Sequence, residues 1–487
     1  MQPIQTLFDS IIPLPSTIDK ALMITGITDR SSEVKQGYVF FAIKGYATDG
    51  HDYIHDAIRK GAAAIIGEKE NLSLPVPYVN VDQSRLVLAK LASRFYDKQE
   101  KKPVMIGITG TNGKTTTSFM LKHLFESVGL SCALFGTVVN IINGEELTST
   151  TNTTLGPIEL HRQLALSNDD IVIMEVSSHA LTQNRVAGIT FDFALFTNLS
   201  QDHLDYHQTM DDYFSAKKAL FALLHRDGKA IINGYNKWGE TLATSLKSEQ
   251  LPVHVLGDTG DFKLKTIHFD SPMKAILSEQ NRECTLTVPL IGEHNMYNAA
   301  MAYMTARLYG LPQGKIVQAF ASFKGAPGRF ELFSHPAGAT FVVDYAHTED
   351  AFSYCLQAIK QMGANSITHI FGFRGNRDSG KREAMIATSE KWANHIVLTF
   401  DDLNNVSEED MRRTLLSFTL KNGSIQTSRP LAIEKAWNSA KKDDWVLITG
   451  KGHERYKQAF QYNSVSDSDT IKHLQNGTLT RRAVKTS

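Results

Sequence analysis

The stretch that decides the fold is residues 104–117, which read VMIGITGTNGKTTT. Its first six residues are mostly apolar and predict a buried strand. A helix is expected next, because apolar side chains recur at the i, i+3, i+4, i+7 spacing from Leu121. The turn between them contains Gly110 and Gly113, which let the backbone approach a bound group closely. This order of strand, glycine-containing turn and helix predicts a loop that holds a phosphate chain at a helix N-terminus.

Two side chains of this loop have expected roles. Lys114 would neutralise charge on the β- and γ-phosphates, and the Thr115 hydroxyl would bind Mg²⁺. The strict P-loop pattern has a glycine five positions before Gly113, whereas this chain has Ile108. The alternative is an ordinary strand-to-helix turn with a capping threonine and an exposed lysine.

The rest of the chain also follows an α/β pattern. Residues 171–176 (IVIMEV) and 191–199 (FDFALFTNL) are too apolar for half-exposed strands, so the sheet is expected to be covered on both faces. Further along, four candidate strands alternate with stretches of helical length, which predicts a mostly parallel, Rossmann-like sheet. These strands are 340–345, 368–373, 395–400 and 444–450.

Two changes in composition mark domain boundaries. The polar stretch 96–102 (YDKQEKK) precedes the first central strand, and 324–329 (KGAPGR) is rich in glycine and proline. A chain of 487 residues is long enough for roughly three domains. We therefore expect an α/β protein with domains at 1–100, 101–326 and 327–487.

Composition limits the partners and the location. Lys and Arg total 51 and Asp and Glu total 51, and this net charge of zero argues against a nonspecific nucleic-acid binder. The three cysteines lie far apart, which indicates a reducing compartment. We find no signal peptide, and no run reaches the ~18 apolar residues of a membrane span. We expect a cytoplasmic protein without membrane insertion and without a nucleic-acid partner.

Three further segments contain candidate site residues. Glu175 ends an apolar strand, where α/β sheets bind ligands, and its carboxylate suits Mg²⁺; a helix N-cap network through Ser177 and Ser178 is the alternative. The segment 197–207 (TNLSQDHLDYH) could bind a metal through its histidines or could be a solvated polar loop. In 213–221 (YFSAKKALF), a lysine that covers the helix surface is the simpler interpretation.

Taken in this order, these segments resemble the Mur ligase family, and most closely its MurE type. Those enzymes add the third amino acid to UDP-N-acetylmuramoyl-L-Ala-D-Glu in peptidoglycan synthesis. The resemblance extends over nearly the whole chain, through TGTNGKT, EVSSHAL, DHLDYH, Y..AK, GEHNMYNAAMA (292–302), GRFE (328–331), DYAH (344–347), GKGHE (450–454) and KGYATDGHDYI (44–54). It implies an N-terminal UDP-substrate-binding domain, a central P-loop ATPase domain with a mostly parallel sheet, and a C-terminal Rossmann-like domain that binds the amino acid.

The resemblance also implies roles for individual residues. The residues around ATP would be Gly110, Thr111, Asn112, Gly113, Lys114, Thr115, Thr116, Asn295, Asn298, Arg329 and Asp344. Two Mg²⁺ sites would be formed by Thr115, Glu175, His203 and Lys217, with Lys217 carbamylated by CO₂ to N6-carboxylysine. The UDP-N-acetylmuramoyl-dipeptide and a free amino acid would contact Ser31, Thr153, Thr154, Ser177, Gln183, Arg185, Arg377, Asp401, Asp402, Gly450 and Glu454. Lys114, Lys217 and His203 would be the catalytic residues.

The expected reaction turns a peptide carboxylate into an acyl phosphate, which an amine then attacks. Both steps need charge neutralisation on oxygen, which Mg²⁺, Lys114 and Arg329 would supply. Water has to be kept from the acyl phosphate, so domain closure is expected. We expect the enzyme to act as a monomer.

The chain departs from the MurE pattern where the added amino acid is expected to bind. MurE enzymes that add meso-diaminopimelate carry Asp-Asn-Pro-Arg, whose arginine holds the distal carboxylate, but the aligned residues 401–404 read Asp-Asp-Leu-Asn. Because an acidic pair suits a cationic side chain, L-lysine or L-ornithine is favoured. The alternative is diaminopimelate, with another cation such as Arg374 or Arg377 in the arginine's place.

Smaller departures keep other hypotheses open. Residues 30–32 read Arg-Ser-Ser instead of Asp-Ser-Arg, 153–155 read Thr-Thr-Leu instead of Thr-Thr-Pro, and 347–349 read His-Thr-Glu instead of His-Thr-Pro. These changes would fit a paralogue that amidates a different carboxylate. A non-catalytic nucleotide-binding scaffold is a second alternative, and the complete set of ATP-binding motifs argues against it.

Overall fold

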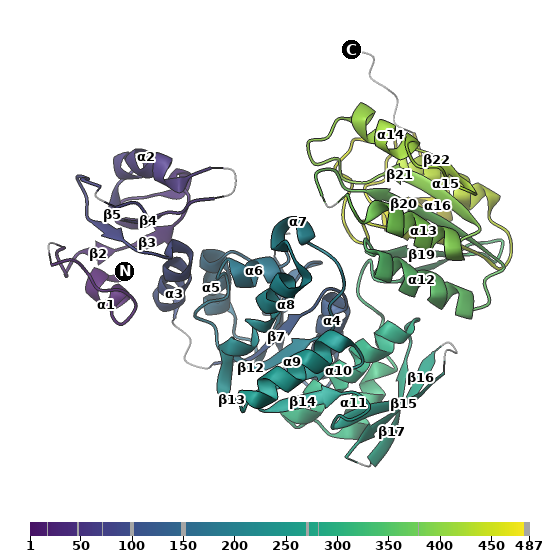
Figure 1. Cartoon of the computed structure of the whole chain (residues 1–487), viewed down its shortest axis with the longest axis horizontal. Coiled ribbons are helices and arrows are strands. Elements are labelled where there is room, and N and C mark those ends of the chain that lie inside the picture. The colour runs from purple at the N-terminus through teal and green to yellow at the C-terminus, as the bar shows by residue number, and fades with distance from the viewer. Residues whose placement is uncertain are drawn as a thin grey trace. The chain divides into compact units, whose positions relative to one another are not determined.

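The computed structural model describes residues 1–16, 18–45, 48–70, 72–97, 102–147, 152–268, 272–280, 282–377 and 379–481 (Figure 1). Its internal contacts divide the chain into two units. The first comprises Met1–Thr109, Leu130–Ala194 and Ala216–Gly228, and the second comprises Gly110–Gly129, Leu195–Ser215 and Lys229–Ser487. The predicted domain boundary near residue 100 and part of the KGYATDGHDYI motif lie outside the described residues.

The N-terminal part of the chain folds around a parallel sheet in the order β3-β4-β5-β6. Its strands and helices are β3 (Gly26–Thr28), β4 (Tyr38–Ala42), β5 (Ala62–Gly67), β6 (Tyr78–Asn80), α1 (Ile4–Phe8), α2 (Ile54–Arg59), α3 (Ser84–Tyr96) and the 3-10 turns η1 (Ser31–Glu33) and η2 (Gly50–Tyr53), with a short pair β1 (Gln2–Pro3) and β2 (Met23–Ile24) beside them. Val39 and Phe41 belong to one buried cluster, and Phe40 belongs to another. Because both faces are covered, β4 is a continuous apolar run rather than an alternating one.

The central sheet has the strand order β10-β9-β8-β11-β7-β12-β13-β14-β15-β16-β17. The strands are β7 (Val104–Thr109), β8 (Cys132–Phe135), β9 (Asn140–Ile142), β10 (Glu145–Glu146), β11 (Ile171–Glu175), β12 (Phe191–Phe196), β13 (Leu224–Asn233), β14 (Val253–Leu256), β15 (Phe262–His268), β16 (Met273–Glu279) and β17 (Arg282–Val288). The pairs of β11 with β7 and β8 are parallel, whereas β15, β16 and β17 form an antiparallel end. The buried strands predicted at 104–109 and 171–176 are therefore confirmed as β7 and β11, and the structure shows that they are neighbours in one sheet.

The helices that accompany these strands carry most of the predicted site motifs. They are α4 (Lys114–Glu126), α5 (Pro157–Leu166), α6 (Ser178–Thr182), α7 (Leu204–His207), α8 (Met210–Lys218), η3 (Phe221–Leu223), α9 (Lys237–Ser248), α10 (Glu293–Tyr309) and α11 (Gln313–Phe320). Within the described part of the chain, no helix combines the length and the apolar character needed to cross a membrane.

The C-terminal part forms a second α/β sheet in the order β18-β19-β23-β20-β21-β22, parallel except for the pair of β18 and β19. Its elements are β18 (Glu331–Ser334), β19 (Thr340–Asp344), α12 (Glu349–Gln361), β20 (Ser366–Phe373), α13 (Arg382–Trp392), β21 (His395–Phe400), α14 (Glu408–Leu416), β22 (Gly423–Ile425), α15 (Arg429–Ser439), β23 (Asp444–Thr449) and α16 (Asp467–Gln475).

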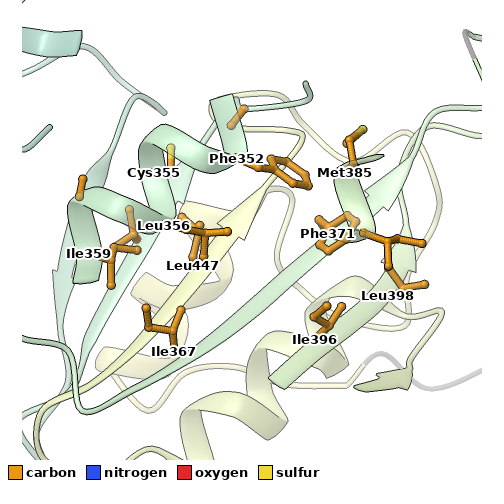
Figure 2. Packing of buried hydrophobic residues seen from close by; sticks show 14 of the residues in the cluster. Phe352, Cys355, Leu356, Ile359, Ile367, Phe371, Met385, Ile396, Leu398 and Leu447 are labelled. Atoms are coloured by element: carbon orange, nitrogen blue, oxygen red, sulfur yellow. The ribbon is translucent and has the colours of Figure 1, made fainter. Parts of the chain in front are cut away.

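Two buried clusters cover the two faces of this sheet. Side chains of α12, α13 and α14 pack on one face, and those of α15 and α16 pack on the other. Figure 2 shows part of the first cluster, with residues of α12 and α13 against the strands. The ring centroids of Phe352 on α12 and Phe371 on β20 are 4.8 Å apart. The predicted Rossmann-like arrangement of a parallel sheet between helices is confirmed.

Candidate active site

The turn after β7 has the shape that its two glycines allow. Gly110 has a φ of +148° and Gly113 a φ of +88°, a region that residues with a side chain rarely adopt. A Cβ at Gly110 would overlap the hydroxyl of Thr197, and a Cβ at Gly113 would overlap the side-chain oxygen of Asn298. Both positions therefore require glycine, and we call residues 110–116 the phosphate loop.

The phosphate loop is held in shape by the segment after β12. The Thr111 and Asn112 amides donate to the backbone and side-chain oxygens of Asn198, each at 2.9 Å. The Thr197 hydroxyl donates to the Asn112 carbonyl at 2.6 Å. Because these bonds form within the protein itself, the turn is organised before any phosphate binds.

Lys114 and Thr115, the first residues of α4, lie where the sequence predicts them. The Lys114 ammonium donates to the Gly110 carbonyl at 2.7 Å and to the Thr111 carbonyl at 2.9 Å, so it is folded back over the loop. Thr115 is only 3% exposed, and its hydroxyl accepts a bond from Arg329 at 3.1 Å. The alternative of a plain turn with an exposed lysine does not describe this geometry.

Arg329 reaches the loop from a turn that Asp344 fixes. The Asp344 carboxylate accepts bonds from the Phe330 amide at 2.7 Å and the Ala346 amide at 2.6 Å. The Arg329 guanidinium lies 4.3 Å from the ring centroid of Tyr345, which supports it from one side. The structure thus gives Asp344 a positioning role for the arginine.

Asn295 and Asn298 lie one turn apart on α10 and are both buried. The Asn298 amide donates to the Asn295 side-chain oxygen at 3.3 Å, and Asn295 donates to the Ile291 carbonyl at 2.8 Å. Since a Cβ at Gly113 would overlap Asn298, this asparagine lies directly beside the phosphate loop. The predicted nucleotide residues of the second unit are therefore close together.

In the first unit, the predicted ligand Glu175 ends β11 and is completely buried. Its carboxylate accepts bonds from the Thr137 hydroxyl at 2.8 Å and the Thr137 amide at 3.2 Å. Ser177 does cap α6, by accepting from the Ala180 amide. Thr137 is therefore a side-chain partner of Glu175, and the hydroxyl of Ser177 is used to cap α6.

Five predicted substrate contacts lie beside Glu175. The Thr137 hydroxyl, whose proton goes to Glu175, lies 3.2 Å from the Thr153 hydroxyl, and the Thr154 hydroxyl donates to the Glu175 carbonyl at 2.8 Å. The same hydroxyl of Thr154 accepts from the Ser177 amide at 3.0 Å. Arg185 completes the group, because it donates to the Thr154 carbonyl at 3.0 Å and to the Gln183 side chain at 2.8 Å. These residues form a polar cluster at the carboxyl end of the buried strand β11.

Three further predicted site residues are Lys217, His203 and Ser31. Lys217, near the end of α8, is 1% exposed, so it does not cover the helix surface. His203 has a φ of +55° at the start of α7, with its Nε2 3.4 Å from Asp202. Ser31 begins η1, where its carbonyl accepts from Lys60.

Within the described ranges, no three His, Cys, Asp or Glu side chains gather as a metal site, so a bound Mg²⁺ would also need hydroxyl, modified-lysine or phosphate oxygens.

Two partners of Asp202, Lys381 and His347, were not predicted from the sequence. Lys381 lies 3.2 Å and His347 3.5 Å from the Asp202 carboxylate. Burial alone would raise the pKa of Asp202, but the bond and charge of His347, together with the charges of His203 and Lys381, hold it well below its usual range. The DYAH motif could have pointed to His347, whereas no local signal identifies Lys381.

Six charged side chains meet beyond the carboxyl ends of β20, β21 and β23. We call them the strand-end cluster: Arg374, Asp401, Asp402, Lys451, Glu454 and Lys457. Lys451 lies 2.6 Å from Asp402 and 3.5 Å from Asp401, and Lys457 lies 2.8 Å from Asp402. Arg374 lies 2.6 Å from Glu454. Three carboxylates therefore face three cations.

This charge balance alters the expected pocket. Burial by itself raises the pKa of Asp401, but Arg374, Lys451 and Arg429 outweigh it and hold that pKa below its usual range. Burial raises the pKa of Tyr345, whose hydroxyl donates to Glu454, to about 12. The pair Asp401 and Asp402 is thus already compensated from within the chain, rather than open to a cationic side chain.

Two other predicted residues border this region differently. A Cβ at Gly450, where φ is +107°, would lie 2.7 Å from Asp401, so the chain after β23 runs close against the cluster. Arg377 is 54% exposed and lies 3.9 Å from Asp205. The structure therefore places Gly450 at the cluster and pairs Arg377 with a different carboxylate.

Comparisons with known proteins cover the same regions. Family models described as "Mur ligase family, catalytic domain", "Mur ligase middle domain" and "Mur ligase, glutamate ligase domain" match residues 23–96, 108–306 and 328–452. UDP-N-acetylmuramoyl-L-alanyl-D-glutamate--2,6-diaminopimelate ligase of Aquifex aeolicus is 36% identical over 93% of this chain and 94% of its own. The enzyme of the same name from Bacillus velezensis is 38% identical over 89% and 90%. A solved structure of a ligase of that name has a TM-score of 0.69, at 27% identity over 97% of this chain and 98% of its own.

Proposed function

This chain belongs to the Mur ligase family, as a member of its MurE type, and from that premise we propose which residues carry out its reaction. It is an ATP-dependent amide ligase that adds a diamino acid to UDP-N-acetylmuramoyl-L-alanyl-D-glutamate in peptidoglycan synthesis. The observation that carries the assignment of residues is the phosphate loop, in which Lys114, Thr115 and Arg329 converge. ATP is the substrate that this loop binds.

The chemistry sets the tasks of these residues. The dipeptide carboxylate is a poor electrophile, because it is anionic and its oxygen is a poor leaving group. Transfer of the γ-phosphoryl group makes an acyl phosphate, and the amine of the diamino acid then attacks the carbonyl carbon and expels phosphate. Lys114 neutralises charge on the transferred group and Arg329 approaches it from the C-terminal part of the chain.

Magnesium is the proposed metal, bound by Thr115, Glu175, His203 and a carbamylated Lys217. Oxygen atoms of a buried hydroxyl and a buried carboxylate are ligands that this hard cation prefers. When bound, Mg²⁺ neutralises phosphate charge. The family resemblance, and not a cluster of ligands in the structure, supports two sites.

Carbamylation of Lys217 is supported by its burial. A buried ammonium is costly, and reaction of the amine with CO₂ replaces it with a carbamate that a cation can bind. Lys217→Ala should lose activity and regain part of it when short carboxylates are added. An unmodified Lys217 in the active enzyme, together with no rescue, would count against the modification.

The charge balance of the strand-end cluster favours 2,6-diaminopimelate as the diamino acid over lysine. A lysine side chain would bring a further cation to carboxylates that already have three cationic partners. Diaminopimelate carries a carboxylate beside its distal ammonium, so it adds no net charge. The relatives named above are diaminopimelate ligases, which agrees with this choice.

A panel of amino acids tests the function. Purified protein receives ATP, Mg²⁺, UDP-N-acetylmuramoyl-L-Ala-D-Glu and one amino acid, and ADP release is followed. We expect release that requires both the dipeptide and the amino acid and is fastest with diaminopimelate. ADP release without an acceptor would indicate a bare ATPase, and release with another acid in place of the dipeptide would indicate a paralogue with a different substrate.

The remaining predicted properties rest on the sequence alone. These are the domain bounds 1–100, 101–326 and 327–487, the monomeric state, the absence of a nucleic-acid partner and the cytoplasmic location. Size-exclusion chromatography with light scattering would test the monomeric state.

A further inference from the structure

Two arginines lie beside the ring of Tyr345, and their charges are held in different ways. The guanidinium of Arg374 lies 5.3 Å from the ring centroid and pairs with Glu454 at 2.6 Å. The guanidinium of Arg329 lies closer, at 4.3 Å, and forms no ion pair with the described residues of the chain. It donates to the Thr115 hydroxyl at 3.1 Å. Among the described residues, the ring face and this one hydroxyl therefore hold the Arg329 guanidinium.

We propose that Tyr345 is a positioning residue for phosphoryl transfer, which holds Arg329 by its ring face so that the guanidinium donors stay free for the transferred phosphoryl group. This inference rests on the function proposed above. It adds a residue that acts on the phosphoryl group through Arg329.

An aromatic support for Arg329 has a chemical reason. A guanidinium has five N–H donors in a planar fork, and a carboxylate partner would occupy two of them and neutralise the charge. The face of a phenol ring attracts a cation without such a loss of donors. Since the hydrogen bond of this guanidinium in the described structure goes to Thr115, the rest of the fork is available to phosphate oxygens.

The ring of Tyr345 is itself fixed at both ends. Burial raises the pKa of Tyr345 to about 12, so its hydroxyl stays protonated and donates to Glu454 at 2.9 Å. At the backbone end, a Cβ at Gly452 would lie only 2.9 Å from the Cβ of Tyr345. A ring that is already fixed offers Arg329 a rigid surface, so less conformational entropy is lost when the arginine binds phosphate.

Two glycines bring the turn of Arg329 against this tyrosine. Gly328 has a φ of +65° and Gly452 a φ of +53°. A Cβ at Gly328 would overlap the amide nitrogen of His453, and a Cβ at Gly452 would lie 2.7 Å from the Gly328 carbonyl oxygen. The turn before Arg329 therefore packs backbone to backbone on the chain after β23, beside Tyr345.

Tyr462 provides a matched control in the C-terminal part of the chain. The guanidinium of Arg481 lies 5.7 Å from its ring centroid, and its hydroxyl donates to Glu434 at 2.7 Å. Unlike Arg329, Arg481 pairs with a carboxylate, that of the same Glu434, at 3.3 Å. These three residues belong neither to the phosphate loop nor to the strand-end cluster, so a substitution of Tyr462 should change stability and leave kcat unchanged.

Two variants separate the ring of Tyr345 from its hydroxyl. Tyr345→Phe removes the bond to Glu454 but keeps the ring face, and Tyr345→Leu removes both. With ATP, UDP-N-acetylmuramoyl-L-Ala-D-Glu and diaminopimelate, we expect kcat to fall about 10-fold in Tyr345→Leu and by no more than about 3-fold in Tyr345→Phe, with KM for the dipeptide substrate unchanged. Tyr462→Leu should keep the wild-type kcat. Equal losses of kcat in the two Tyr345 variants would overturn the inference.

A double-mutant cycle tests whether Tyr345 acts through Arg329. Arg329→Ala alone should lower kcat by about 100-fold or more. Adding Tyr345→Leu to it should lower kcat by less than about 2-fold further, because the ring then has no guanidinium to hold. A further loss of about 10-fold would mean that the tyrosine acts independently of the arginine, which would also overturn the inference.

Fluorinated phenylalanines in place of Tyr345 test the ring face with little change in shape. Fluorine withdraws electron density from the face and weakens its attraction for a cation, so kcat should fall stepwise with each added fluorine. A constant kcat would mean that the ring only fills space, and would overturn the inference even if Tyr345→Leu unfolds in a thermal melt. No ADP release by the wild-type protein with any amino acid would instead contradict the proposed function.

Discussion

The phosphate loop and the strand-end cluster both follow the carboxyl ends of parallel strands, but they are built in opposite ways. The loop is a run of consecutive residues whose shape depends on two glycines and on bonds to backbone groups. The cluster consists of charged side chains that come from three strand ends and balance one another. The carboxyl ends of parallel strands can thus form a site either through local backbone conformation or through charge pairs between residues far apart in the sequence.

The largest expected effect comes from removing the loop's cation. In Lys114→Ala, phosphate charge is no longer neutralised at the loop, so we expect ADP release to fall by about 10³-fold or more. Lys122→Ala on the same helix is the control, because Lys122 lies two turns beyond the loop and pairs with Glu126 of the next turn, an interaction worth about 0.5 kcal/mol. Near-normal ADP release in Lys114→Ala would remove the assigned role of this lysine.

Substitutions in the strand-end cluster should lower the free energy of unfolding rather than the rate of ADP release. Lys451 is 1% exposed and faces Asp401 and Asp402, so Lys451→Met leaves buried carboxylates without their main partner. We expect the free energy of unfolding to fall by about 3 kcal/mol or more. The control is Lys457→Met: Lys457 also pairs with Asp402 but is 69% exposed, so the loss should stay below about 1 kcal/mol. Urea unfolding measures both, and equal losses would mean that burial does not set the strength of these pairs.

The difference in construction explains what the sequence could predict. The strand, the glycine turn and the start of α4 were predictable, because each depends on residues within a few positions. The fold class followed from apolar runs that match β7 and β21 residue for residue. The interpretation of Asp401 and Asp402 as an open acidic pair could not include Lys451, about 50 positions further on.

Burial of single side chains was equally hard to predict. The segment 213–221 favours a surface lysine, but Lys217 lies near the end of α8 and is buried. The sequence offers Arg374 and Arg377 as alternative cations for the amino-acid pocket. The structure distinguishes them, because Arg374 bonds to Gly450 and Glu454, whereas Arg377 is exposed and lies near Asp205. Side chains that depend on distant partners need the three-dimensional structure.

Two glycines with the same φ angle separate the effect of the loop from that of backbone strain. Gly113 and Gly129 both have a φ of +88°, but a Cβ at Gly113 would overlap Asn298, whereas one at Gly129 would meet no described atom within 4 Å. Both alanine variants should lose about 1 kcal/mol of stability from backbone strain. Only Gly113→Ala should also weaken ATP binding, by about tenfold, since its loop has to shift. Calorimetric titration with ATP measures this, and equal affinity in the two variants would show that close packing at Gly113 is dispensable.

The smallest expected effect concerns a histidine beneath the strand-end cluster. His369 is fully buried in β20 and bonds to the Ser389 hydroxyl at 2.8 Å and to the hydroxyl of Thr449, which directly precedes Gly450, at 3.0 Å. Burial, with a smaller effect of the Arg429 charge, lowers the pKa of His369 to about 3, whereas an unfolded histidine has a pKa of about 6.5.

Between these two values the unfolded chain binds a proton that the folded chain does not bind. The stability that neutral His369 contributes is therefore complete above about pH 6.5 and is lost as the pH falls toward 3. From pH 7.5 to 5.5 we expect a loss of about 1 kcal/mol in the free energy of unfolding of the C-terminal part, measured by urea unfolding. His369→Gln keeps a side chain that can hydrogen-bond but does not titrate, so its loss over this range should be smaller by that amount. An equal loss in both proteins would mean that protonation of His369 does not cause the loss of stability. Titration of other groups would then cause it.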